Sequence, residues 1–246
     1  MTVNDKVPDD LAALFSPDAA EEPLHTDLRP HVEPLLNIGE CLRHPLLYSV
    51  PYWPQMNRLL NRQYAHRLEA VAEARAAGSW ERFVFMHERP YRFNALAEVA
   101  SAITDASFWR LLRQVWIDSE NIWEHMVYAR AVWEMPNPDR QSVMTKPERA
   151  ALAAMPETFP IFRGACSRHD DPKEGLSWTT SLKVAEWFSR RYSGSRPVVI
   201  EATVRRDDVL AFFTQRNESE IVVFPEMLGH VFEHPSTHPN AKKKAT

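Results

Sequence analysis

Two carboxylates lie directly before an apolar run, in the stretch Glu218-Ser219-Glu220 followed by residues 221–224. In a β-strand, side chains at positions i and i+2 share one face. The spacing therefore predicts that Glu218 and Glu220 point the same way, about 6.5–7 Å apart along the strand. The same sequence would also fit two acids at an exposed strand end that form surface salt bridges. However, like charges on one face repel, and the apolar run is typical of the centre of a sheet, which favours a pair placed for chemistry.

A second segment suits the binding of a phosphate. Residues 159–163 predict a strand that ends in Arg163 and is followed by Gly164. An arginine presents a planar fork of donors that matches phosphate oxygens, and a glycine allows a ligand to approach the backbone closely. A strand end with a solvated charge and a turn glycine is the plainer interpretation.

A third segment is rich in hydroxyl groups. The run Ser-Trp-Thr-Thr-Ser begins at Ser177 and precedes a helix expected over residues 182–191. Either Thr180 or Ser181 is expected to cap that helix, because a hydroxyl oxygen can accept a bond from a free backbone N–H. This leaves Ser177 and Thr179, which share a strand face, without an explanation from capping.

In order and spacing, the three segments resemble the ADP-ribosyltransferase family, in the branch with an arginine, a Ser-Thr-Ser-like strand and a Glu-x-Glu strand. The resemblance covers about residues 156–226. Phe162-Arg163-Gly164 is similar to the aromatic-arginine first strand of that family. The resemblance implies that Arg163 and Gly164 lie at NAD, with Arg163 on its phosphate and ribose.

The middle strand of the resemblance is Ser177-Trp178-Thr179. Its first hydroxyl, on Ser177, is implied to hold the catalytic glutamate and the NAD ribose, and Thr179 to lie at the cofactor. Trp178 stands where the family has a threonine, and its ring is a candidate to stack on nicotinamide. The hydroxyl that meets the glutamate could instead belong to Thr180 or Ser181.

The remaining matches lie in the helix after this strand and in the acidic pair. Residues 185–188 resemble the Ala-x-x-Phe of the family's helix, so Phe188 is a candidate cofactor contact. Glu218-Ser219-Glu220 resembles the Glu-x-Glu strand. The resemblance implies that Glu220 is catalytic and that Glu218 receives the acceptor.

The chemistry that the resemblance implies uses NAD as a co-substrate and no metal. A carboxylate at Glu220 would stabilise the oxocarbenium-like ribose that forms as nicotinamide departs. The expected reaction is transfer of ADP-ribose to a macromolecule. A protein arginine is favoured over RNA or DNA, because a guanidinium is the natural partner of Glu218. The family implies a bacterial toxin or a phage effector, with an antitoxin or a host factor as a possible partner.

Two other functions are compatible with the same motifs. A NAD glycohydrolase would use Glu220 with water as the acceptor and would need no target-binding loop. A non-catalytic interaction protein would retain the fold without the reaction.

Apolar residues spaced at i, i+3 and i+4 predict the elements that precede these motifs. Residues 35–155 are expected to be helical, with an irregular proline-rich start up to residue 54. The capping-box pattern Thr145-Lys146-Pro147-Glu148 predicts the start of a short helix. The predicted helices span residues 55–77, 93–103, 106–117, 121–133 and 146–154.

Beyond residue 156 the pattern changes to short β-like runs around one helix. The predicted strands span residues 159–163, 198–204, 209–213 and 221–224. The expected fold class is α+β: a helical N-terminal region followed by a split antiparallel sheet of the ADP-ribosyltransferase type. The expected organisation is a flexible leader at 1–34, a helical region at 35–155, a catalytic domain at 156–234 and a disordered tail at 235–246.

Composition narrows the class of protein. The chain has 246 residues and a formal net charge of −4, so no global positive field would hold nucleic acid. Six glycines form neither GxGxxG nor GxxxxGK, which excludes the two common phosphate loops. Cys41 and Cys166 match no metal spacing and are expected to be reduced thiols. No long apolar stretch and no signal pattern occurs, so we expect a cytoplasmic protein without a membrane partner.

Overall fold

The computed structural model describes residues 22–35, 39–119, 122–136, 138–166, 172–191, 196–215 and 218–234. The chain divides into two units, Met1–Val99 and Ala100–Thr246. The domain boundary expected at residue 155 therefore falls inside the second unit, because helices from residue 100 onward pack with the sheet. Residues 1–21 and the expected tail at 235–246 lie outside the described residues.

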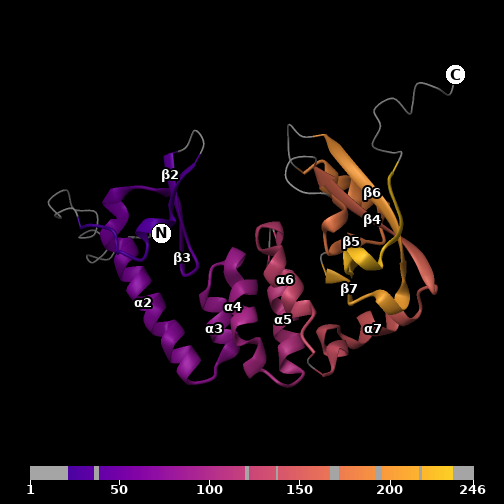
Figure 1. Cartoon of the computed structure of the whole chain (residues 1–246), viewed down its shortest axis with the longest axis horizontal. Coiled ribbons are helices and arrows are strands. Elements are labelled where there is room, and N and C mark those ends of the chain that lie inside the picture. Colours follow the sequence, from indigo (N-terminus) through magenta and orange to yellow (C-terminus); the bar gives the residue numbers. More distant parts are fainter. Residues whose placement is uncertain are drawn as a thin grey trace, which may run out of the picture. The chain divides into compact units, whose positions relative to one another are not determined.

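The described residues of the first unit form a small sheet and three α-helices (Figure 1). Its helices are α2 (Asn57–Ala76), α3 (Trp80–Met86) and α4 (Arg92–Val99). Its antiparallel sheet has the order β1-β2-β3, with β1 at Val32–Leu35, β2 at Gly39–His44 and β3 at Leu47–Tyr52.

This sheet corrects two sequence predictions. Residues 35–155 are not all helical, because residues 39–52 form a hairpin in which His44 pairs with Leu47. Prolines in this segment mask the alternation of the strands, and one of them lies in the two-residue turn. The expected leader at 1–34 is too long, since Leu24 is 6% exposed and Leu28 is fully buried in the core against α2.

The second unit contains a six-stranded antiparallel sheet of order β7-β8-β5-β4-β6-β9. The strands are β4 (Thr158–Cys166), β5 (Ser177–Thr179), β6 (Pro197–Arg205), β7 (Ala211–Phe213), β8 (Glu220–Val222) and β9 (Gly229–Glu233). The α+β class is thus confirmed. The four strands predicted from the apolar runs correspond to β4, β6, β7 and β8, and β4 continues three residues beyond its expected end at Arg163. Strand β5 is the one that the resemblance implies, and β9 was missed.

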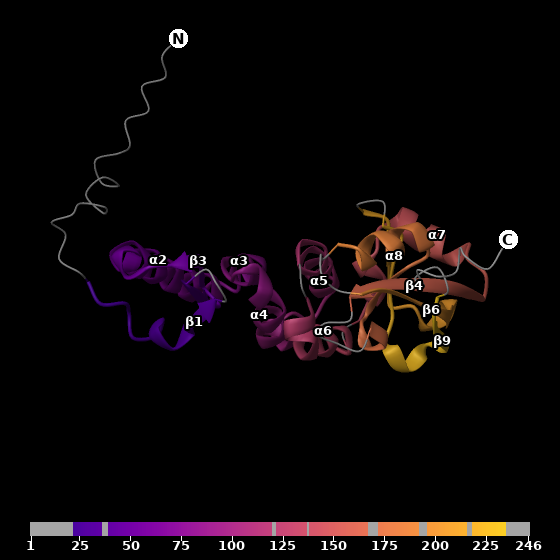
Figure 2. The same ribbon diagram turned by 90° about the horizontal axis from the view of Figure 1, so that it is seen from above.

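Four α-helices lie in the described part of this unit. They are α5 (Ser107–Asp118), α6 (Met126–Trp133), α7 (Lys146–Ala153) and α8 (Leu182–Ser189). Short 3-10 turns flank them: η5 (Ile122–His125), η6 (Arg140–Val143) and η8 (Arg206–Asp208). Helix α8 packs on β4 and β6, as Figure 2 shows. Among the described residues, no helix combines the length and the apolarity needed to cross a bilayer.

The start of α7 confirms the predicted capping box. The Thr145 hydroxyl accepts a bond from the Glu148 backbone N–H at 3.4 Å, and the Glu148 carboxylate accepts one from the Thr145 N–H at 2.8 Å. Because Glu148 is 1% exposed, this cap lies inside the protein, next to α5. Helix α7 is therefore anchored to the helical layer as well as to the edge strand β7.

Candidate active site

The sheet of the second unit opens between β4 and β5. These two strands share a single registered pair, Phe162 with Thr179, whereas β4 and β6 pair over nine positions. A hollow of about 190 Å³ lies along this opening, and a cavity of about 380 Å³ adjoins it. Both are lined by five residues predicted from the sequence: Arg163, Ser177, Phe188, Glu218 and Glu220.

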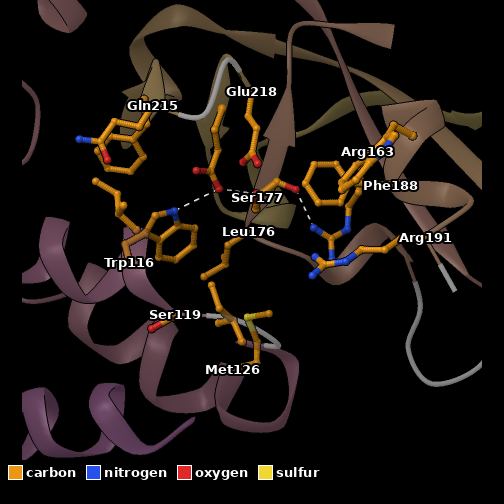
Figure 3. A pocket seen from close by; sticks show the side chains of 15 residues that line it. Trp116, Ser119, Met126, Arg163, Leu176, Ser177, Phe188, Arg191, Gln215 and Glu218 are labelled. Carbon is orange, nitrogen blue, oxygen red and sulfur yellow. Dashed lines mark hydrogen bonds between the residues drawn. The ribbon is translucent and has the colours of Figure 1, made fainter. Parts of the chain in front are cut away.

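Glu220 is the first residue of β8 and is fixed from two sides. Its backbone pairs with Thr179 of β5 and with Phe213 of β7. Its Oε1 atom accepts a hydrogen bond from the Ser177 hydroxyl and another from the Trp116 indole N–H at 3.1 Å (Figure 3). Two donors on one oxygen set the orientation of the carboxylate.

The hydroxyl that meets Glu220 belongs to Ser177, not to Thr180 or Ser181. Thr179 lies opposite Glu220 in the ladder, but its hydroxyl donates to the carbonyl of Glu218 at 2.5 Å. Ser181 is the N-cap of α8 and accepts a bond from the backbone of that helix. Thr179 therefore positions the segment that carries the acids, and at 6% exposure it offers little surface to a cofactor.

Glu218 reaches the cavity by a different route from the one predicted. The strand begins only at Glu220, and Ser219 has a φ of 47°, in the left-handed region. The regular alternation of a strand is therefore broken between the two acids. Both side chains nevertheless line the same cavity. The prediction that the two acids point the same way is therefore confirmed, but the prediction that they alternate within one strand is wrong.

Arg163 is held in the cavity by the backbone of β5. Its guanidinium donates to the carbonyl of Ser177 at 2.6 Å. Gly175 makes room for it, since a Cβ at that position would lie 2.0 Å from the Arg163 Cζ. Arg191 lines the same cavity, and Figure 3 places its guanidinium beside that of Arg163.

Sequence reasoning missed the role of Arg191. Its signal was its position three residues after Phe188, on one face of the helix expected over residues 182–191. In the structure α8 ends at Ser189, two residues before Arg191. Trp187 is 60% exposed and also lines the cavity, so this aromatic rather than Trp178 is available to stack on a ligand ring.

Two predicted cofactor contacts have structural roles instead. Trp178 is 2% exposed and donates its indole N–H to the carbonyl of Gly175 at 2.8 Å, so its ring belongs to the core. Gly164 borders the smaller hollow, but the approach that it permits is that of α8. A Cβ there would lie 1.9 Å from the carbonyl oxygen of Ala185.

The helical layer supplies the wall that faces the acids. Its apolar residues Ile117, Ile122 and Met126 line the larger cavity together with Trp116. Trp116 is 3% exposed and packs edge-to-face on Trp133 with ring centroids 5.4 Å apart, so its ring belongs to the core. Its second role, as a donor to Glu220, was missed because the two lie far apart in sequence.

A buried ion pair ties this wall to the segment that carries the acids. Arg113 of α5 makes two bonds to Glu148, at 2.7 and 3.0 Å. The same carboxylate accepts the backbone N–H of Thr214 at 3.1 Å, just after β7. Burial opposes the charge of Glu148, but the bonds from Arg113, Thr145 and Thr214 outweigh it and lower the pKa of Glu148 to about 2.

The cavity therefore brings opposite charges together. Arg163 and Arg191 line it with Glu218 and Glu220, and Ser177 bonds to both Arg163 and Glu220. Such a layout suits a ligand with an anionic diphosphate and a cationic ring. Within the described part of the chain, no three His, Cys, Asp or Glu side chains gather as metal ligands.

Comparison of the chain with protein-family models, with curated proteins and with solved structures found no match.

Proposed function

We propose that this protein is a mono-ADP-ribosyltransferase that moves ADP-ribose from NAD to a macromolecule. The observation that carries the proposal is the bond from the Ser177 hydroxyl to the Glu220 carboxylate, in a cavity that Arg163 also lines. The opening between β4 and β5 supports a split sheet of the ADP-ribosyltransferase type. The residues of the resemblance thus meet in one place, although they are 57 positions apart along the chain from Arg163 to Glu220.

NAD fits the charge layout of the cavity. Its diphosphate would bind at Arg163 and Arg191, where two guanidiniums offer forked donors. Its nicotinamide riboside, which carries a positive ring, would then lie toward Glu220. Phe188 and Trp187, which also line the cavity, supply aromatic surface for the rings of NAD.

The reaction breaks the bond between ribose C1′ and the nicotinamide nitrogen. The electron pair of that bond leaves with neutral nicotinamide, and Glu220 stabilises the positive charge that develops on the ribose. The acceptor then donates a lone pair to C1′ and loses a proton, which Glu218 is placed to receive. A protein arginine is the favoured acceptor because its guanidinium complements Glu218. A nucleic-acid hydroxyl or base would be the alternative.

The helical wall favours a second candidate, a NAD glycohydrolase. Side chains from α5 to α6 line the side of the cavity that faces the acids, which leaves water better access than a large acceptor. The two reactions share Glu220 and differ only in the group that attacks C1′.

The test measures nicotinamide release and label transfer from NAD labelled in its adenosine part, with and without cell lysate. Wild type should release nicotinamide, and Glu220→Gln should lose at least about 100-fold of that rate. Glu218→Gln should lose only the part that lysate stimulates.

Each outcome separates the candidates. Label on macromolecules supports the transferase, and nicotinamide release without label on macromolecules supports the glycohydrolase. If wild type neither binds NAD at millimolar concentration nor releases nicotinamide, both enzymatic functions are wrong and an interaction protein remains.

A further inference from the structure

A second hollow in the unit of residues 100–246 shares no lining residue with the candidate active site. It has a volume of about 750 Å³ and lies between η6 and α7 on one side and η8 and the start of β7 on the other. In Figure 1, α7 and β7 lie next to each other, and they are in contact. Four basic side chains and one acid line this groove: Arg140, Lys146, Arg149, Arg206 and Asp207.

Neutral groups hold the arginines of the groove in place. Arg149 donates to the backbone carbonyls of Gln141 and Met144, at 3.1 and 2.6 Å. Arg206 donates to two carbonyls at the end of α7, at 3.0 and 3.2 Å. Arg140 lies over the ring of Trp109 at 5.6 Å. Carbonyls and rings orient a guanidinium without cancelling its charge.

The positive charge of the groove is left available to a ligand. Across the part of the chain that the structure describes, Asp207 is the only carboxylate within ion-pair distance of these four side chains, at 3.9 Å from Arg206. The Asp207 side chain is 73% exposed, so this pair is weak. By contrast, Arg113 and Arg130 of the same unit have carboxylates at hydrogen-bond distance.

Apart from Gln141, the rest of the lining is apolar. It includes Met144, Leu152 and Leu210, and it contains no aromatic residue. A nucleic acid would find no surface on which to stack its bases, and four cations would neutralise few phosphates. A protein segment can place carboxylates on the cations and small apolar side chains on the lining.

We propose that this groove binds an acidic segment of a partner protein. Guanidiniums pair with carboxylates through two parallel bonds, which matches the three arginines. Binding there would not depend on the reaction proposed above. The three-residue strand β7 separates the groove from the segment that leads to Glu218, a distance of about 10 Å.

The test uses the full chain and two fluorescent probes: a peptide of alternating Glu and Ala, and a single-stranded DNA of equal charge. Fluorescence anisotropy should show peptide binding that weakens with salt. The double variant Arg140→Glu/Lys146→Glu should weaken it at least about tenfold. Lys146 is the first residue of α7, where an acid suits the helix dipole, so this change spares the fold.

The matched control is Arg58→Glu/Arg62→Glu, which reverses two exposed charges on α2. It should bind the peptide as wild type does. Lys146→Gln alone, which removes one charge without adding repulsion, should give a smaller loss. Equal peptide affinity in the groove variant and the control would overturn the proposal, as would DNA binding that is tighter than peptide binding and is lost in the groove variant.

Discussion

Glu148 offers a test of how the helical layer stabilises the site, through the variant Glu148→Gln. The carboxyl has a pKa of about 2 in the folded protein, against an ordinary value of 4.5. A shift of that size corresponds to about 3 kcal/mol of folding free energy at neutral pH. Replacement by glutamine also leaves Arg113, whose side chain is 13% exposed, without its charged partner. We therefore expect a loss of about 3–5 kcal/mol at pH 7.

The sign of the pH dependence follows from proton binding. Between about pH 4.5 and pH 2 the unfolded carboxyl is protonated while the folded one is not, so the unfolded state binds more protons. The stabilisation is complete above pH 4.5 and is lost as the pH falls toward 2. Near pH 2 about half of the wild-type carboxyls are protonated, so most of the difference between wild type and Glu148→Gln should be gone, and below pH 2 it should approach zero.

Denaturant unfolding followed by tryptophan fluorescence at several pH values measures this difference. The matched control is Glu226→Gln, because Glu226 pairs with Arg130 on the surface and its side chain is 47% exposed. That change should cost no more than about 1 kcal/mol. A stability difference for Glu148→Gln that stays constant from pH 7 to pH 3 would refute the reasoning, since the ion pair could not then be its source.

Three further predictions concern the hydrogen bond from Trp116 to Glu220, the packing of α8 on Gly164, and His44 in the first unit. Trp116→Phe keeps the buried ring but removes the N–H that reaches Glu220, so the rate of nicotinamide release should fall about 10- to 100-fold with little change in the KM for NAD; an unchanged rate would show that Ser177 alone suffices. Gly164→Ala forces a methyl group into the backbone of α8, so thermal unfolding should show a loss of several kcal/mol, and a wild-type Tm would contradict the packing. Burial, together with the nearby charge of His31, lowers the pKa of His44 to about 4. The folded first unit should therefore lose up to about 3 kcal/mol of stability as the pH falls from 6.5 to 4, which hydrogen exchange in α2 can measure. His44→Gln should abolish this pH dependence.

Most of the residues that line the candidate site, and the elements that carry them, could be predicted from the sequence. Strand and helix spacing place Arg163, Ser177, Phe188 and Glu220 in four separate elements: β4, β5, α8 and β8. These elements meet because β5 lies between β4 and β8 in the sheet and α8 packs on β4. The cap of α7 was likewise readable, since a capping box depends only on residues three apart. Short-range patterns of this kind are decided by the local backbone.

What was missed depends on contacts that spacing does not encode. Trp116 lies 104 residues before its partner Glu220, and its periodicity shows only that it is buried. Trp178 donates its indole N–H to a carbonyl three residues away, so its ring packs in the core. The resemblance had favoured a ligand contact at this position. The hairpin at residues 39–52 was hidden by its prolines, because turn chemistry and strand alternation overlap there.

The bond from Trp116 to Glu220 bears on how the protein can be shortened. A fragment that starts at residue 156 would keep every residue of the family resemblance. It would lack α5 and α7, however, so the part of the cavity that holds Glu218 and Glu220 would be open to water. Such a fragment should be inactive even if its sheet forms. If the proposed function holds, we expect the smallest active piece to begin near Ala100, where the second unit starts, and to be about twice the length that the motifs span.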